Sequence, residues 1–193
     1  MDTNIGVLAL QGAVSEHYSH VYKCGAQARE VRKPGDLDGL HGLIIPGGES
    51  TTIGYLMRET DLDKAVVEKN SQGMALFGTC AGMVLLAAEV EDGVSDQPYL
   101  GLMDARVKRN AFGRQRESFE FPIISEEWGQ PVQGVFIRAP IVTSVGAEVQ
   151  VIAQLEEGIV AARQGNILVT SFHPELVDDL TIHNYFLQMC GEK

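Results

Sequence analysis

Short apolar runs that end at glycine or proline alternate with helical stretches through the first half of the sequence. Such runs indicate strands that are buried on both faces, and helices between them predict a parallel sheet covered on both sides. The runs occupy residues 4–10, 28–31, 43–46 and 74–77, and the helical stretches occupy 14–24, 50–70 with a break near 59–61, and 81–88.

Beyond Gly93 the apolar pattern changes. Shorter segments alternate between apolar and polar residues, which predicts partly antiparallel strands. These segments cover residues 105–108, 118–121, 149–154 and 159–162, before a last apolar strand at 167–170 and a terminal helix at 178–190. No repeat, low-complexity tract or linker divides the chain, so we expect a single domain over residues 1–193.

The charge and the cysteines restrict the partners and the compartment. A formal net charge of −11 argues against a nucleic-acid backbone as ligand and favours a partner with a basic docking face. Three widely spaced cysteines make a disulfide framework or a structural zinc site unexpected. The N-terminus has no basic stretch of the signal-peptide kind, and no apolar run is long enough to span a membrane. We therefore expect a cytoplasmic location.

Cys80 lies between Gly78 and Gly82, where the strand expected at 74–77 becomes a helix. The pattern is the thiol counterpart of the G-x-S-x-G nucleophile elbow, in which a sharp turn leaves no room for flanking side chains. At the helix N-terminus, unpaired N–H groups stabilise a thiolate, and the N–H of Ala81 can stabilise an oxyanion. The alternative is a small buried residue in a tight turn.

His173 follows the last apolar strand, at 167–170, and is a candidate base for Cys80. If that strand neighbours the strand at 74–77, both side chains lie at the same sheet edge. Glu175, two residues on, can accept a hydrogen bond from the imidazole and fix its tautomer. A solvated turn histidine is the alternative for His173 taken alone.

The segment 44–52 ends a strand in Pro-Gly-Gly and opens a helix. Backbone N–H groups at such a junction can bind an anion, so Gly48 is the candidate second oxyanion donor. The segment is neither a P-loop nor a dinucleotide fingerprint. The alternative is a plain glycine turn with a Ser/Thr helix cap.

His17, His20 and Cys24 fall at i, i+3 and i+7 of the expected helix at 14–24. Three such side chains on one exposed helix face seldom make a metal site, so no metal is expected.

Six segments in the same order resemble the class I (triad) glutamine amidotransferases, and more narrowly the glutaminase subunits of pyridoxal 5′-phosphate synthase. The match spans nearly the whole chain. The segments are LQGAVSEH (10–17), PGGESTTIG (46–54), GTCAGM (78–83), RNAFGRQ (109–115), FIRAP (136–140) and SFHPEL (171–176).

The resemblance implies an α/β three-layer sandwich, with a central mostly parallel sheet in a flavodoxin-like arrangement and a smaller antiparallel strand set. It also implies that Cys80 attacks the side-chain amide of L-glutamine, while Gly48 and Ala81 hold the oxyanion. His173, oriented by Glu175, would protonate the leaving ammonia and then activate water against the γ-glutamyl thioester.

Substrate recognition by family analogy would involve both signs of charge, with Glu49 taking the α-ammonium of glutamine and Arg106 or Arg138 its carboxylate. Arg109, Arg114 and Arg116 are expected at the surface or an interface, and Cys24 and Cys190 as packing thiols. The implied substrate-binding set is Gly47, Gly48, Glu49, Ser50, Arg106, Ile137 and Arg138.

The resemblance also implies a partner, a (β/α)8-barrel synthase subunit that combines the ammonia with a pentose phosphate and a triose phosphate. Gln11 is implicated in the switch by which docking of that partner activates the site. Pyridoxal 5′-phosphate would be the partner's product, and no cofactor is expected for this chain. Three alternatives stay open: a glutaminase serving another synthase, a cysteine hydrolase or peptidase, and a docking subunit without catalysis.

Overall fold

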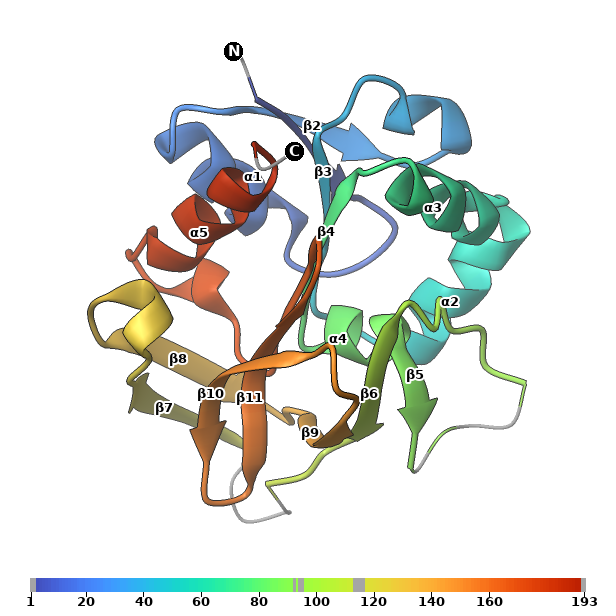
Figure 1. The fold of residues 1–193 in the computed structure, drawn as a ribbon. Helices are drawn as coiled ribbons and strands as arrows, with labels where there is room; N and C mark the ends of the chain where they lie inside the picture. The colour runs from blue at the N-terminus through green and yellow to red at the C-terminus, as the bar shows by residue number, and fades with distance from the viewer. Residues whose placement is uncertain (1–2, 92, 94–95, 113–116, 192–193) are drawn as a thin grey trace.

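The computed structural model describes residues 3–91, 93, 96–112 and 117–191 (Figure 1). Five strands form the parallel part of its main sheet, in the order β2-β1-β3-β4-β12, which is the 2-1-3-4-5 order of flavodoxin-like sheets. The strands are β1 (Asn4–Leu8), β2 (Gln27–Val31), β3 (Gly42–Ile45), β4 (Ala75–Thr79) and β12 (Ile167–Thr170).

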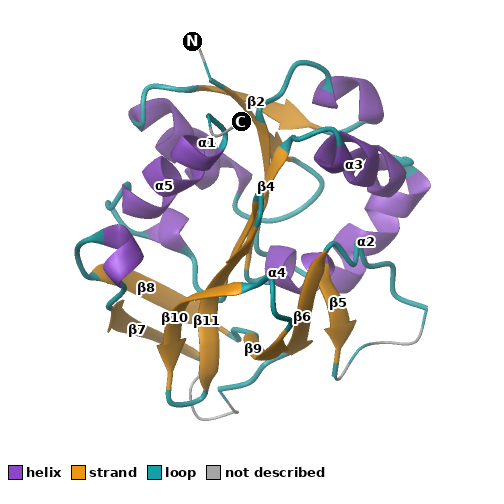
Figure 2. Cartoon of the chain, in the orientation of Figure 1, coloured by secondary structure: helices purple, strands orange, loops and turns teal. Residues whose placement is uncertain are grey.

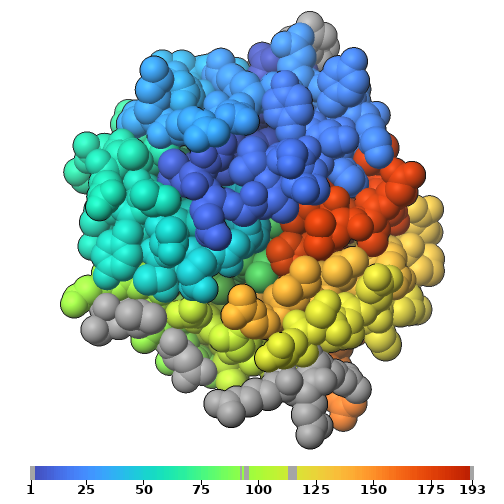
Figure 3. Space-filling view, turned by 180° about the vertical axis from the view of Figure 1, so that it is seen from behind, coloured from blue at the N-terminus to red at the C-terminus, as the bar shows by residue number. Residues whose placement is uncertain are grey.

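Helices cover both faces of this parallel part, which confirms the expected three-layer α/β architecture (Figure 2). One face carries α1 (Val14–Lys23) and α5 (Thr181–Met189). The other carries α2 (Ser50–Glu59), α3 (Leu62–Ser71) and α4 (Ala81–Leu86). The early and final segments of the chain meet at the surface, where blue and red lie side by side (Figure 3).

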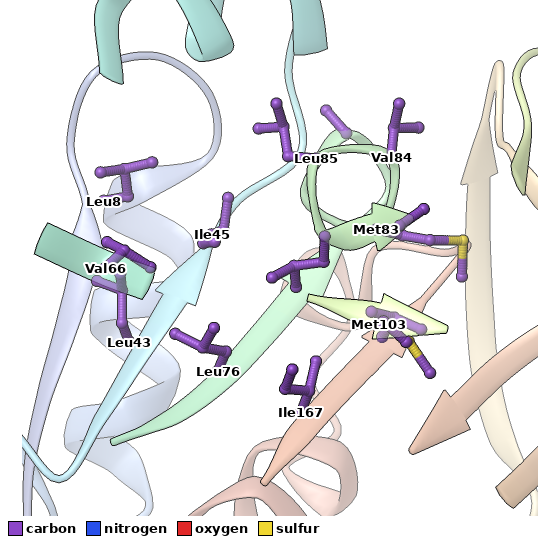
Figure 4. Close-up of a cluster of buried hydrophobic side chains, with 14 of the residues drawn as sticks. Leu8, Leu43, Ile45, Val66, Leu76, Met83, Val84, Leu85, Met103 and Ile167 are labelled. Carbon is purple, nitrogen blue, oxygen red and sulfur yellow. The ribbon is translucent and has the colours of Figure 1, made fainter. Parts of the chain in front are cut away.

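Successive side chains of the central strands point into two different cores, one on each face of the sheet. Leu43 and Ile45 of β3 pack with Leu76 and Val66 in the core under α2, α3 and α4 (Figure 4), whereas Ile44 points into the core under α1 and α5. All five side chains are fully buried. The apolar runs are continuous because both sides of each strand face a core.

The remaining strands continue the main sheet to ten strands, mostly by antiparallel pairing. The expected antiparallel set is therefore joined to the parallel part, with a separate two-stranded sheet of β7 (Ser118–Ile123) and β8 (Val132–Ile137) beside it. The continuing strands are β5 (Ala87–Val90), β6 (Met103–Lys108), β9 (Ile141–Val145), β10 (Gln150–Leu155) and β11 (Gly158–Gln164).

Two expected helix boundaries are wrong. The chain leaves α4 at Leu86 because Ala87 pairs with Met103 of β6, and this pairing overrides the helical propensity of alanine. The last helix begins at Thr181 instead of residue 178, because a 3-10 turn (Pro174–Leu176) precedes it and Asp179 accepts a hydrogen bond from the Thr181 N–H. Two further 3-10 turns are Pro34–Leu37 and Glu126–Trp128.

The Ser/Thr cap that was the alternative for segment 44–52 does not form at the start of α2. Glu49 is the N-cap residue of α2, and its side chain makes no capping hydrogen bond. Ser50 is already helical and buried, and its hydroxyl accepts a hydrogen bond from Nε2 of Gln97 at 3.2 Å. Within the described residues, no helix combines the length and apolar character needed to cross a membrane.

Candidate active site

A cavity of about 400 Å³ opens at the carboxyl ends of β1, β3 and β4. Ligands of open α/β sheets bind at this edge, and the volume is within the range of about 300–1,000 Å³ of small-molecule sites. It is lined by Gln11, Gly12, Ala13, Gly47, Gly48, Glu49, Ser50, Cys80, Ala81, Val84, Arg109, Asn110, Ile137, Arg138, Pro140, His173 and Leu176.

Cys80 occupies a sharp turn between β4 and α4, with φ 48° and ψ −100°. This is a sparsely populated conformation for a residue with a side chain. The turn is held because the Cys80 N–H donates to the Thr170 carbonyl at 2.8 Å. A Cβ on Gly82 would collide with the Ile45 carbonyl oxygen, and one on Gly78 would lie 2.6 Å from the Gly82 carbonyl carbon. The glycines therefore permit the backbone contacts that aim Cys80 at the cavity.

His173 reaches the same cavity from the loop after β12, which pairs with β4. Its imidazole lies against Gly47, where an added Cβ would collide with Cε1. Nδ1 donates to Oε1 of Glu175 at 2.7 Å, which leaves Nε2 as the proton acceptor for a nucleophile. Burial alone would lower the pKa of His173, but hydrogen bonds with Cys80 and Glu175 raise it to about 10.

Glu175 lies behind His173 and is itself buried. Burial tends to raise the pKa of this carboxyl, but His17 and His173 nearby hold it below its usual range. The carboxylate is therefore charged at neutral pH and can stabilise an imidazolium on His173.

The histidines of α1 are buried, so the expectation of an exposed face is wrong. His17 is 0% exposed and His20 is 6% exposed, and both approach His183 of α5. The helix turns this face toward α5 because Val21, on the same side, belongs to the core between them. Among the described residues, no group of three or more His, Cys, Asp or Glu side chains is placed to hold a metal ion.

The Pro-Gly-Gly loop after β3 is tied to its neighbours by two backbone N–H groups. Gly47 donates to Oγ1 of Thr79 at 3.0 Å, and Glu49 donates to Oε1 of Gln11 at 2.7 Å. Gly48, between them, faces the same side-chain oxygen, because an added Cβ would lie 2.7 Å from it. The Gln11 side chain therefore holds the loop that the sequence assigns to oxyanion binding.

The FIRAP segment forms the opposite side of the cavity. The Cys80 sulfur lies 3.9 Å from the Ile137 carbonyl oxygen. Arg138 has φ 43°, a left-handed conformation that is uncommon outside glycine, and its N–H donates to the Glu117 carbonyl at 2.7 Å. The structure therefore brings Ile137 and Arg138 to the cavity with Glu49 and Ser50, as the sequence analysis expects.

Arg106 is not among the residues that line this cavity. It lies on β6 in a half-exposed ion pair, with Nη2 2.6 Å from Oε2 of Glu89. Arg109 lines the cavity instead, with Nη2 3.2 Å from Oε1 of Glu49. The surface assignment of Arg109 is thus corrected, while Arg114 and Arg116 lie outside the described residues. RNAFGRQ was itself a signal, because its first two residues, Arg109 and Asn110, line the cavity.

Cys24 and Cys190 have environments unlike that of Cys80. Burial raises the pKa of the Cys24 thiol and raises that of Cys190 to about 12, so both stay protonated at neutral pH. A protonated thiol is a poor nucleophile, in agreement with packing roles.

An amide carbon in this cavity would meet the thiol of Cys80 on the side where His173 can take or give a proton. Such an arrangement on a sheet of flavodoxin order defines a class of protein, the α/β amidohydrolases with a cysteine nucleophile. The chain belongs to the SNO glutamine amidotransferase family, whose model matches residues 7–192.

Several bacterial proteins are similar to the chain over nearly their whole length. "Pyridoxal 5′-phosphate synthase subunit PdxT" of Desulforamulus reducens is 54% identical over 186 residues, covering 96% of this chain and 98% of that protein. The protein of the same name from Thermus thermophilus is 53% identical over 188 residues, covering 97% of each.

Solved structures agree with the family. A crystal structure described as a glutamine amidotransferase matches with a TM-score of 0.92 and 49% identity, covering 97% of this chain and 99% of that one. The PurLQS structure from Thermotoga maritima matches with a TM-score of 0.65 at 17% identity, covering 98% and 96% of the two chains, and shows the fold alone.

Proposed function

We propose that this chain hydrolyses L-glutamine to L-glutamate and ammonia as the glutaminase subunit of a pyridoxal 5′-phosphate synthase. Membership of the glutamine amidotransferase family and the names of relatives at about half identity support this function. The observation that carries the chemistry is the 2.7 Å hydrogen bond between His173 and Glu175, beside the strained Cys80 at the cavity.

In the first half of the reaction, the Cys80 thiolate attacks the side-chain amide carbon of glutamine. A carbon–sulfur bond forms, and the amide oxygen becomes an oxyanion that the N–H groups of Gly48 and Ala81 stabilise. The protonated His173, held by Glu175, donates its proton to the amide nitrogen. The carbon–nitrogen bond then breaks and ammonia leaves.

In the second half, water attacks the γ-glutamyl thioester while His173 accepts its proton. Cys80 leaves as a thiolate, and glutamate is released. A pKa of about 10 for His173 in the resting site favours its imidazolium form, which holds the proton that the departing ammonia needs. Once the thioester forms, the thiolate partner is gone, which lowers the proton affinity of His173 and suits it to act as a base.

The α-carboxylate and α-ammonium of glutamine would be recognised at the cavity wall by Arg109 and Glu49. These two side chains form an ion pair with each other at 3.2 Å in the free chain. A zwitterionic substrate can separate this pair. Its α-carboxylate then takes the place of the Glu49 carboxylate beside Arg109, and its α-ammonium takes the place of the Arg109 guanidinium beside Glu49. The Ile137–Arg138 backbone, beside Cys80, would border the reacting end of the substrate.

Gln11 would act as the activation switch. Its side-chain oxygen accepts the Glu49 N–H at 2.7 Å and lies close to Gly48, so it constrains the loop that must stabilise the oxyanion. Docking of a partner near the loop after β1 would change this contact. We therefore expect low glutaminase activity from the chain alone.

The partner would be the (β/α)8-barrel synthase subunit, in a hetero-oligomer, with ammonia passing to it through a protected interior route. Ammonia released into water would be protonated to ammonium, which is not a nucleophile. We further propose that the chain is one glutaminase domain over residues 1–193 and that it works in the cytoplasm without a cofactor of its own.

The test measures glutamate release from L-glutamine by this chain alone and with a pyridoxal 5′-phosphate synthase barrel subunit. Cys80→Ala serves as the control for activity from other sources. Strong stimulation by the barrel subunit is the expected result. High activity that the barrel leaves unchanged would overturn the partner, and an inactive pair would overturn the reaction.

A further inference from the structure

Two buried histidines lie behind the triad, outside the cavity. His17 of α1 and His183 of α5 are 0% and 1% exposed, and Nδ1 of His17 lies 2.9 Å from Nε2 of His183. The other ring nitrogen of His17, Nε2, lies 3.4 Å from Oε2 of Glu175 and 3.3 Å from Oγ1 of Thr79. The row runs from α5 through α1 to the carboxylate that orients His173.

The hydrogen-bond geometry determines which nitrogens carry protons. Nδ1 of His183 has no hydrogen-bond partner among the described residues. A buried acceptor without a partner is less costly than a buried N–H without one, so the proton of a neutral His183 belongs on Nε2. Nε2 of His183 then donates to Nδ1 of His17, and the proton of His17 is placed on its Nε2. That N–H hydrogen-bonds Oγ1 of Thr79 at 3.3 Å and lies 3.4 Å from Oε2 of Glu175.

We propose that His17, held in this tautomer by His183, is a positioning residue that orients the Glu175 carboxylate for catalysis. This inference rests on the proposed glutaminase function. Glu175 uses Oε1 for His173, whereas its buried Oε2 has no hydrogen-bond partner in the described part of the chain. The Nε2–H of His17 lies 3.4 Å from this second oxygen, close enough to act on it electrostatically.

His17 also connects the carboxylate with the oxyanion loop. Its Nε2 is within reach of Thr79 Oγ1, which accepts the N–H of Gly47 at 3.0 Å. The His17 imidazole thus lies beside Glu175, which orients the base, and beside Thr79, which anchors the loop at Gly47. Because His17 lies against both, it can keep the Glu175 carboxylate and the Pro-Gly-Gly loop in fixed relative positions.

The charges around His17 favour a dipolar contact instead of an ion pair. Burial lowers the pKa of His17 despite the nearby Glu175, and His173 and His20 lower it further. His183 of α5 is kept neutral in the same way, by burial and by His17 and His20. Glu16 at the start of α1 acts in the opposite direction on His17 but is a smaller influence than burial.

Loss of the His17 N–H would remove the positive end of a dipole that lies 3.4 Å from Oε2 of Glu175. The pKa of Glu175 would then rise, because its charged form is stabilised less. Protonated Glu175 supports the imidazolium of His173 poorly, so the acid limb of activity would move to higher pH. We expect a shift of about one pH unit, which corresponds to about 1.4 kcal/mol.

Three substitutions separate positioning from packing. His17→Gln retains an amide N–H near the place of Nε2, and His17→Phe retains the ring volume without a donor. His20→Gln is the matched control, because His20 is also buried on α1 but its ring nitrogens lie 2.9 Å from the Glu16 and Val177 carbonyl oxygens instead of near Glu175. Its loss would affect helix packing and leave the Glu175 contact in place.

The experiment measures kcat against pH in the complex with the barrel subunit, together with the melting temperature of each variant. We expect His17→Phe to move the acid limb upward by about one pH unit, and His17→Gln to return it toward the wild-type position. His20→Gln should lower the melting temperature without moving the limb. The proposal would be overturned if the acid limb of kcat in His17→Phe stayed at the wild-type pH, or if it shifted equally in His17→Phe and His17→Gln.

A second measurement does not depend on glutamine hydrolysis. Alkylation of Cys80 by iodoacetamide, followed by peptide mass spectrometry across pH, reports the same His173–Glu175 support. His17→Phe should move this profile to higher pH, and His20→Gln should not. If glutamine hydrolysis proves absent but the alkylation shift appears, the proposed function fails and the role of His17 stands; an unshifted profile would reject that role.

Discussion

Thr79 and Thr170 are register partners at the ends of two neighbouring parallel strands, β4 and β12. Cys80 is the next residue after Thr79, and His173 lies three residues after Thr170. Residues 93 apart in sequence therefore reach one cavity, because parallel neighbours end at the same sheet edge. The N–H of Cys80 bonds directly to the Thr170 carbonyl, so the nucleophile is fixed to the strand that leads to its base.

The strained turn at Cys80 predicts that two inactive variants of this residue differ in stability. Cys80→Ala and Cys80→Gly should both abolish glutamine hydrolysis. Glycine adopts φ 48° and ψ −100° without a Cβ penalty, so Cys80→Gly should be about 1 kcal/mol more stable than Cys80→Ala. Urea unfolding of both variants checks this. A less stable glycine variant would argue against strain at the elbow.

The 2.7 Å bond between His173 and Glu175 predicts unequal losses when each is replaced. His173→Asn should reduce kcat by orders of magnitude because it removes both the acid and the base. Glu175→Gln should cost less, since an amide oxygen can still accept the Nδ1 proton. Initial rates of glutamate release at saturating glutamine, in the complex with the barrel subunit, provide the comparison. A wild-type rate for Glu175→Gln would contradict the stabilisation of the His173 imidazolium by the Glu175 carboxylate.

The two nearby arginines predict a clean contrast in substrate binding. Arg109→Gln should raise KM for glutamine about 10- to 100-fold with a smaller change in kcat, because it removes a charge-assisted contact with the α-carboxylate. Arg106→Gln is the matched control on β6, and KM should stay within about twofold. Steady-state kinetics with varied glutamine test the pair. A larger effect at Arg106 would return the carboxylate site to that residue.

The buried neutral histidine of α5 predicts acid sensitivity of the fold. Because the pKa of His183 is lowered by burial, the unfolded chain binds this proton below about pH 6.5 and the folded chain does not. Stability should therefore rise with pH on the acid side of about pH 6.5. His183→Phe should reduce that slope by up to about 1.4 kcal/mol per pH unit.

The measurement is the free energy of unfolding at several pH values, for the wild type, His183→Phe and the control His41→Phe. His17 has the same sign of shift, so part of the slope should remain in His183→Phe. An unchanged slope in His183→Phe would mean that His183 is not kept neutral by the fold.

Local sequence patterns were sufficient for the parallel strands and for the elbow. The runs around Ile44 and Leu76 are apolar on both faces, which requires two covering layers and hence helices on both sides. Gly78 and Gly82 indicated the turn because only glycine allows the backbone contacts there. The resemblance to glutamine amidotransferases added the strand arrangement and the chemistry of the triad.

Long-range pairing accounts for what those patterns missed. Ala87 and Ala88 resemble a helix end, but pairing of the segment with β6 makes it a strand. Arg106 and Arg109 are three residues apart and chemically identical. Only the turn after β6 directs Arg109 toward Glu49 while Arg106 pairs with Glu89 on the sheet.

By itself, the sequence determined the alternation of strands and helices, the candidate nucleophile, base and orienting carboxylate, and the family. The tertiary structure decided which arginine reaches the cavity and that His17 and His183 meet behind Glu175. The physical reason is that the hydrophobic periodicity of a sequence predicts each helix or strand separately and does not predict how these elements pack together. Contacts between α1, α5 and the loop after β12 depend on how separate elements pack across more than 150 residues of chain.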